Sequence, residues 1–97
     1  MLRIVKMEFN PQDVSEFLDM FAEKKELIRN SPGCRGLRLL QDKNTENIFF
    51  TYSRWDKEED LNNYRASELF KSTWALTKTW FSAKPAAWSV EIKEDLF

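Results

Sequence analysis

The chain has 97 residues, with 15 Lys and Arg against 16 Asp and Glu, a formal net charge of −1, and aromatic residues at 14% of its positions. This length fits a single domain, 1–97, because it supplies one modest core and no room for a second. The opposite charges are interspersed, which argues against a nucleic-acid partner or an anionic membrane surface.

Histidine is absent and Cys34 is the only cysteine. The usual metal ligands and any internal disulfide are therefore missing, so we expect no metal. The beginning of the chain lacks the apolar core of a signal peptide, and no apolar run approaches the roughly 20 residues of a membrane span. These features predict a cytoplasmic protein with no membrane contact.

The first elements in chain order are a strand over 2–9 and a helix that begins after Asn10. Asn10 is expected to cap the helix with its side chain, and Pro11 suits the first helical position. The apolar residues that follow have helical spacing and predict the buried stripe of this helix. They are Val14, Phe17, Leu18, Phe21 and Ile28. The segment "NSPGCRG" should end the helix, because Pro and Gly interrupt helical structure.

Two strands are expected next, "GLRLLQD" from Gly36 and "IFFTYSRW" over 48–55. Asp56, with Glu59 three residues later, has the pattern of a capping box for a short helix that ends near Tyr64. Ser67 is expected to cap the last helix. A final strand, "AWSVEIK", follows.

The order is βαββαβ, which predicts the α+β, ferredoxin-like fold: a four-stranded antiparallel sheet with both helices on one face. The third strand is apolar on both faces. Ile48, Phe50 and Tyr52 alternate with Phe49, Thr51, Ser53 and Trp55. Helices can cover only one of these faces, so we expect a homodimer through the face of Ile48, Phe50 and Tyr52. The alternative is a monomer with one apolar face.

The RNA-recognition motif has the same topology and displays aromatic residues on its third strand. Phe50 and Tyr52 could play that part. The Lys/Arg-Gly-aromatic-Gly core of that motif is absent, however, and the net charge has the wrong sign. The sequence therefore favours a small-molecule protein over a nucleic-acid binder.

The segments "SPGCRGLRLLQD" and "FFTYSRWDKEEDLNNYRASELF" resemble the antibiotic biosynthesis monooxygenase family over nearly the whole chain. The shared pattern is an aromatic residue that ends a strand, an acidic residue, a short amphipathic helix and Ser-x-x-Phe, matched by Trp55, Asp56, Leu61, Ser67 and Phe70. The resemblance implies a dimeric α/β barrel. It also implies oxidation of aromatic or quinol-like substrates by O₂, without flavin or metal.

Haem-degrading relatives use an Asn on the first strand, a Trp at the end of the third strand and a His on the last helix. The matching positions here are Val5, Trp55 and Trp74. We expect no haem degradation, because an indole N–H only donates and cannot ligate iron.

The same resemblance implies a pocket under the sheet, with substrate-binding residues from the strands and the last helix. These are Trp55, Thr51, Ser53, Phe70, Trp74 and Val5. Without histidine, the catalytic candidates are Tyr64 as a base and Arg3 as a donor to an anion. Ordinary core packing is the alternative role for the aromatic residues. Two functions remain open: a cofactor-independent monooxygenase-like protein, and a non-catalytic binder of a small aromatic or apolar ligand.

Overall fold

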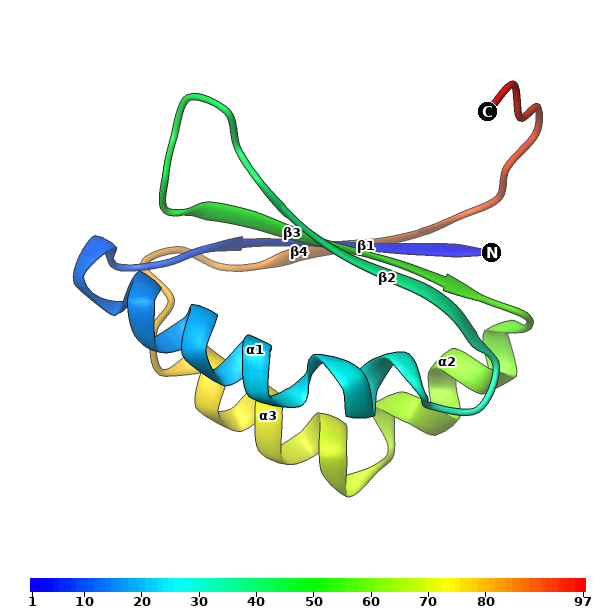
Figure 1. Cartoon of the computed structure of the whole chain (residues 1–97), viewed down its shortest axis with the longest axis horizontal. Coiled ribbons are helices and arrows are strands. Elements are labelled where there is room, and N and C mark those ends of the chain that lie inside the picture. The colour runs from blue at the N-terminus through cyan, green and yellow to red at the C-terminus, as the bar shows by residue number, and fades with distance from the viewer.

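The computed structural model describes all 97 residues, as one sheet with every helix on the same side (Figure 1). The strands pair antiparallel in the order β2-β3-β1-β4, which confirms the predicted ferredoxin-like fold. The strands are β1 (Leu2–Glu8), β2 (Cys34–Gln41), β3 (Ile48–Trp55) and β4 (Ala86–Val90). The helices are α1 (Val14–Arg29), α2 (Glu58–Arg65) and α3 (Glu68–Lys78), with a 3-10 turn, η1 (Pro11–Asp13), before α1.

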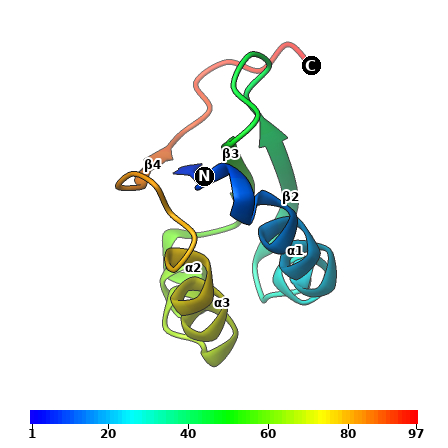
Figure 2. The same cartoon turned by 90° about the vertical axis from the view of Figure 1, so that its left-hand side faces the viewer.

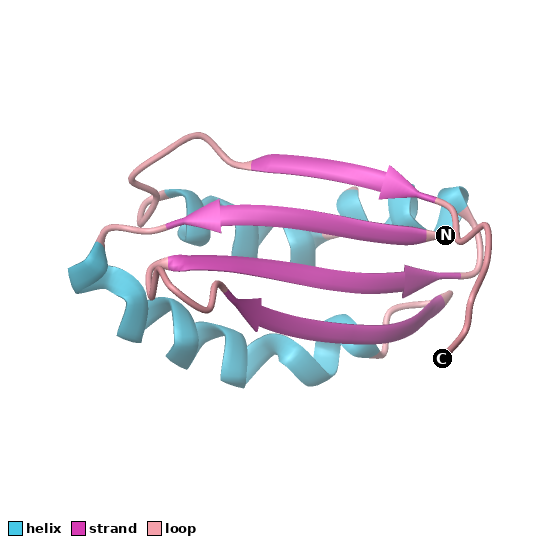
Figure 3. Ribbon diagram, turned by 90° about the horizontal axis from the view of Figure 1, so that it is seen from above, coloured by secondary structure: helices cyan, strands magenta, loops and turns pink.

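The strand register assigns each side chain to a face of the sheet, because directly opposed residues share a face. Val5 of β1 is opposite Thr51 and Ala87, and Arg3 is opposite Ser53 and Ser89. These rows face the helices. The intervening rows form the outer face, which Figure 3 shows in front of the helices and Figure 2 shows above them.

The apolar core is divided into two clusters. The larger one surrounds Phe9 and Phe17, whose rings stack with centroids 4.3 Å apart. The smaller one consists of Cys34, Trp55 and Leu61, beneath the other end of the sheet. Because the two clusters do not merge, space remains between them under the middle of β1 and β3.

Of the three N-cap residues predicted from the sequence, the structure confirms one and contradicts two. Ser67 caps α3, since its hydroxyl accepts a hydrogen bond from the Phe70 amide at 3.2 Å. Asn10 instead donates its side-chain amide to the carbonyls of Trp80 and Phe81. Asp56 accepts two hydrogen bonds from Arg35, which lower its pKa. The caps predicted at Asn10 and Asp56 are therefore wrong, because contacts with residues distant in sequence orient these side chains.

Several boundaries and faces also differ from the expected ones. β2 begins at Cys34, because Arg35 forms a bulge that lets Cys34 pair with Trp55. β4 ends at Val90. On α1, Leu18 is 39% exposed and Met20 is buried, so the stripe runs through Phe17, Met20 and Ile28. None of the helices has the length and apolar character needed to cross a bilayer.

Candidate functional site

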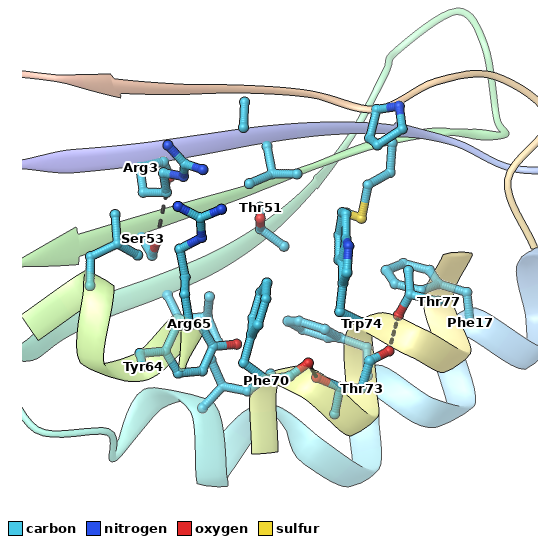
Figure 4. Close-up of a pocket in the computed structure, with 18 of the residues that line it drawn as sticks. Arg3, Phe17, Thr51, Ser53, Tyr64, Arg65, Phe70, Thr73, Trp74 and Thr77 are labelled. Atoms are coloured by element: carbon cyan, nitrogen blue, oxygen red, sulfur yellow. Dashed lines mark hydrogen bonds between the residues drawn. The ribbon is translucent and has the colours of Figure 1, made fainter. Parts of the chain in front are cut away.

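A cavity of about 400 Å³ lies between the helix-facing side of the sheet and the three helices (Figure 4). It occupies the space between the two core clusters. Of its 21 lining residues, 14 are hydrophobic, which is the character of a small-molecule pocket. All eight predicted site residues line it: Arg3, Val5, Thr51, Ser53, Trp55, Tyr64, Phe70 and Trp74.

A continuous series of aromatic rings from β3, α2 and α3 lines this cavity. We call it the aromatic row: Trp55, Tyr64, Phe70 and Trp74. Tyr64 stacks on Trp55 at 5.2 Å and meets Phe70 edge-on at 5.3 Å. Phe70 stacks on Trp74 at 5.8 Å. Helical spacing of 70 and 74 brings the last two rings to one face of α3, so the row offers aromatic surface to a planar ligand.

Trp55 contributes to this row from a buried position. Its side chain is 2% exposed, and its Nε1–H donates to the Ser53 hydroxyl at 2.9 Å. The two residues lie two positions apart on β3, so their side chains share a face. The indole N–H is thus already used within the protein, and Trp55 acts as an apolar wall rather than as a free donor.

Tyr64 lines the cavity with a hydroxyl that has no hydrogen bond to the protein. Burial, and then the nearby Cys34, raise the pKa of Tyr64 to about 12. The phenol is therefore protonated at neutral pH. The raised pKa disfavours the predicted role of Tyr64 as a base and favours a role as a hydrogen-bond donor to a ligand.

Arg3 and Arg65 are the only charged residues that line the cavity. Arg3 comes from β1 and donates to the Ser89 hydroxyl at 3.0 Å, while Arg65 ends α2. Burial, and then the charge of Arg65, lower the pKa of Arg3. Arg65 is exposed, so solvent reaches the cavity rim at this point.

The hydroxyl groups of the remaining polar lining residues differ in whether they already form hydrogen bonds within the protein. Thr73 donates its hydroxyl to the Leu69 carbonyl at 2.8 Å, and Thr77 donates to the Thr73 carbonyl at 2.7 Å. Both bonds stay within α3. The Thr51 hydroxyl makes no hydrogen bond to the protein, so it is available to a ligand together with that of Tyr64.

Sequence reasoning did not identify several lining residues. Met20, Thr73 and Thr77 could have been found from helical spacing, since Thr73 and Thr77 recur with Phe70 and Trp74 on one face of α3. Arg65 gave no such signal, because a cation in the last turn of a helix is common for electrostatic reasons alone. The lining contains no His, Cys, Asp or Glu. No group of three or more such residues lies close enough together to hold a metal ion.

Comparison with known proteins defines the family. The model of the antibiotic biosynthesis monooxygenase family matches residues 1–76, and this chain belongs to that family. Comparison with curated proteins gives no match.

Solved structures share the fold at low sequence identity. A conserved protein from Methanosarcina mazei is 22% identical with a TM-score of 0.83, over 89% of this chain and 86% of its own. An antibiotic biosynthesis monooxygenase is 19% identical with a TM-score of 0.88, over 97% of this chain and 100% of its own. A Mycobacterium tuberculosis protein is 14% identical with a TM-score of 0.88, over 99% of this chain and 97% of its own.

Proposed function

We propose that this protein is a cofactor-independent monooxygenase-like protein that acts on a small aromatic or quinol-type substrate with O₂. The observation that carries the proposal is the aromatic row, which lines a cavity of about 400 Å³ in a chain of the monooxygenase family. This volume lies within the range of ligand pockets, about 300–1,000 Å³. It is also far larger than the voids of a well-packed core.

The reaction class that fits is oxidation of a CH₂ group beside a phenol or enol to a carbonyl. Loss of a proton gives a carbanion, which forms a C–O bond with O₂. Protonation of the resulting peroxide gives a hydroperoxide, which loses water to leave the carbonyl. One oxygen atom enters the product and the other leaves as water. The substrate supplies all four electrons, so no external reductant is needed.

The protein groups would act by binding and orientation rather than by removing the proton themselves. The lining has no His, Asp or Glu, and Tyr64 is protonated at neutral pH. Arg3 would stabilise the ionised substrate oxygen, which lowers the substrate's own pKa, and the proton would leave to solvent at the rim. Tyr64 and Thr51 would donate hydrogen bonds to substrate oxygens. Phe70 and Trp74 would hold the ring.

The second candidate is a non-catalytic binder of an aromatic ligand in the same cavity. The specific observation in its favour is the absence of a general base from the lining. The two candidates share the binding step and differ only in O₂ consumption.

We also propose that the protein is a homodimer through the outer face of the sheet, including Ile48, Phe50 and Tyr52. The central row of this face runs Arg38, Tyr52, Ile4 and Trp88 across all four strands. Trp88 is 48% exposed and Leu40 is 43% exposed. All helices lie on the opposite side (Figure 2), so a second copy of the sheet is the occupant that would cover these side chains.

Oxygen uptake measured with an electrode separates the candidate functions. Hydroxylated naphthalenes and anthrones are added to chelator-treated protein without flavin. If the protein is an oxygenase, O₂ uptake should be saturable, should require the protein and should fall strongly in Phe70→Ala. The matched control is Phe97→Ala, which removes a fully exposed aromatic ring. Saturable binding without uptake supports the binder. Neither binding nor uptake across the panel would contradict both candidates.

A further inference from the structure

The two cavity arginines have no acidic partner within the chain. Its ion pairs are Met1 with Glu91 and Arg35 with Asp56, and neither involves Arg3 or Arg65. Arg3 has one side-chain hydrogen bond, to Ser89, and Arg65 has none. The lining therefore carries two positive charges and no negative one, in a chain whose formal net charge is −1.

We propose that the cavity takes aromatic carboxylic acids, with the carboxylate held between Arg3 and Arg65 at the rim and the ring against the aromatic row. This inference rests on the proposed function, in that the cavity must hold an aromatic ligand. It adds the substrate class and a binding residue, Arg65. It also assigns Arg3 to the carboxylate rather than to the oxygen of the reacting ring, so Tyr64 and Thr51 remain as the donors to that oxygen. It does not depend on whether the ligand is oxidised.

The geometry brings the two cations together from different elements. Figure 4 shows the guanidinium groups of Arg3, from β1, and Arg65, from α2, one above the other on the Ser53 side of the cavity. Two like charges repel each other in the unliganded protein. Burial first, and then this repulsion, lower the pKa of Arg3. An anion between them converts the repulsion into two attractive interactions.

A carboxylate fits this arrangement better than a phenolate does. It is planar with two oxygens, so each guanidinium fork can donate to an oxygen of its own. It is also ionised at neutral pH without help from the protein. At the rim, beside exposed Arg65, the carboxylate keeps part of its hydration, while the apolar ring enters the part of the cavity lined by Phe70 and Trp74.

Calorimetric titration with 2-naphthoate and 2-naphthamide at pH 7 tests the proposal, because the two compounds have nearly the same shape and differ in charge. The wild type is expected to bind the acid roughly tenfold or more tightly, and the acid's affinity should fall as salt is added. Arg3→Gln/Arg65→Gln should remove this preference, because it weakens binding of the acid more than binding of the amide. Lys71→Gln, an exposed cation on α3 outside the lining, is the charge-matched control and should keep the preference.

The outcomes separate the subsite from the proposed function. Equal binding of acid and amide by the wild type overturns the carboxylate subsite and leaves the aromatic cavity standing. The subsite is also overturned if the double variant keeps the preference, or if naphthyl phosphate binds more tightly than naphthoate. Failure of both naphthalene compounds to bind contradicts the proposed function itself, and the subsite with it.

Discussion

At the scale of single residues, Tyr64 shows how burial decides a chemical role. The phenol was a candidate base, yet its pKa is raised to about 12 by burial and by Cys34. A phenolate form would have to exist in a largely apolar cavity wall, next to Trp55 and Phe70. The neutral hydroxyl, which has no protein partner, is suited to donate a hydrogen bond to a bound oxygen.

This raised pKa predicts a loss of stability at high pH. The folded pKa of about 12 exceeds the unfolded value of 10, so the contribution is fully present below pH 10 and is lost as pH rises toward 12. About two pKa units correspond to roughly 2–3 kcal/mol. Urea unfolding between pH 9 and 12 should show this decline in the wild type and a smaller one in Tyr64→Phe. Equal declines in both proteins would contradict the assignment.

Trp55 both packs in the core and lines the cavity, and its contribution to core packing is the larger one. It is 2% exposed and its N–H is bonded to Ser53. Trp55→Ala should therefore destabilise the fold by about 3–5 kcal/mol, as large-to-small core changes do. Differential scanning calorimetry should show a fall in Tm of more than about 10 °C. Phe70→Ala, at a partly exposed position on the cavity, should lower Tm less. The reverse order would show that Trp55 is not core.

At the scale of elements, the turn between α1 and β2 depends on Gly33. Its φ is +82°, and a Cβ atom there would collide with the side chain of Asp60. The Gly33 carbonyl also accepts a hydrogen bond from the Asp56 amide at 2.8 Å. This turn therefore ties the start of β2 to the start of α2, which carries Tyr64 and Arg65.

Gly33→Ala should cost about 1–3 kcal/mol, because the new side chain is strained in this conformation and needs Asp60 to move. Gly36→Ala is the matched control. Its Cβ would meet the Arg54 Cβ at an ordinary 3.8 Å, so the effect should be small. Chemical denaturation of both variants measures the difference, and equal stabilities would refute the argument.

The elements also show what local sequence can predict. Period-two alternation placed Thr51, Ser53 and Trp55 on one face, because this pattern depends only on backbone geometry. Phe70 and Trp74 were assigned to the pocket by the family resemblance. The hydrogen-bond partners of side chains could not be predicted from local sequence. The Asn10 amide and the Asp56 carboxylate bind groups that only the folded chain brings near. Arg65 reaches the site for the same reason, because the folded chain packs α2 beneath β3.

At the scale of the whole molecule, the proposed dimer explains why β3 is apolar on both faces. Light scattering of the wild type at micromolar concentration should give twice the 11.6 kDa mass of one chain. Phe50→Lys should give the monomer mass, because an unpaired charge would be buried in the interface. Phe50→Leu should remain dimeric, and circular dichroism should show that both variants fold. A wild type that is monomeric would contradict the proposal.

The central claim is that the cavity beneath the sheet is the ligand site. A crystal structure of the protein saturated with 2-naphthoate tests it most directly. We predict density for a planar ring against Phe70 and Trp74, with the carboxylate within hydrogen-bond distance of Arg3 or Arg65. A ligand found only elsewhere on the molecule, or a cavity filled by repacked side chains, would contradict the account.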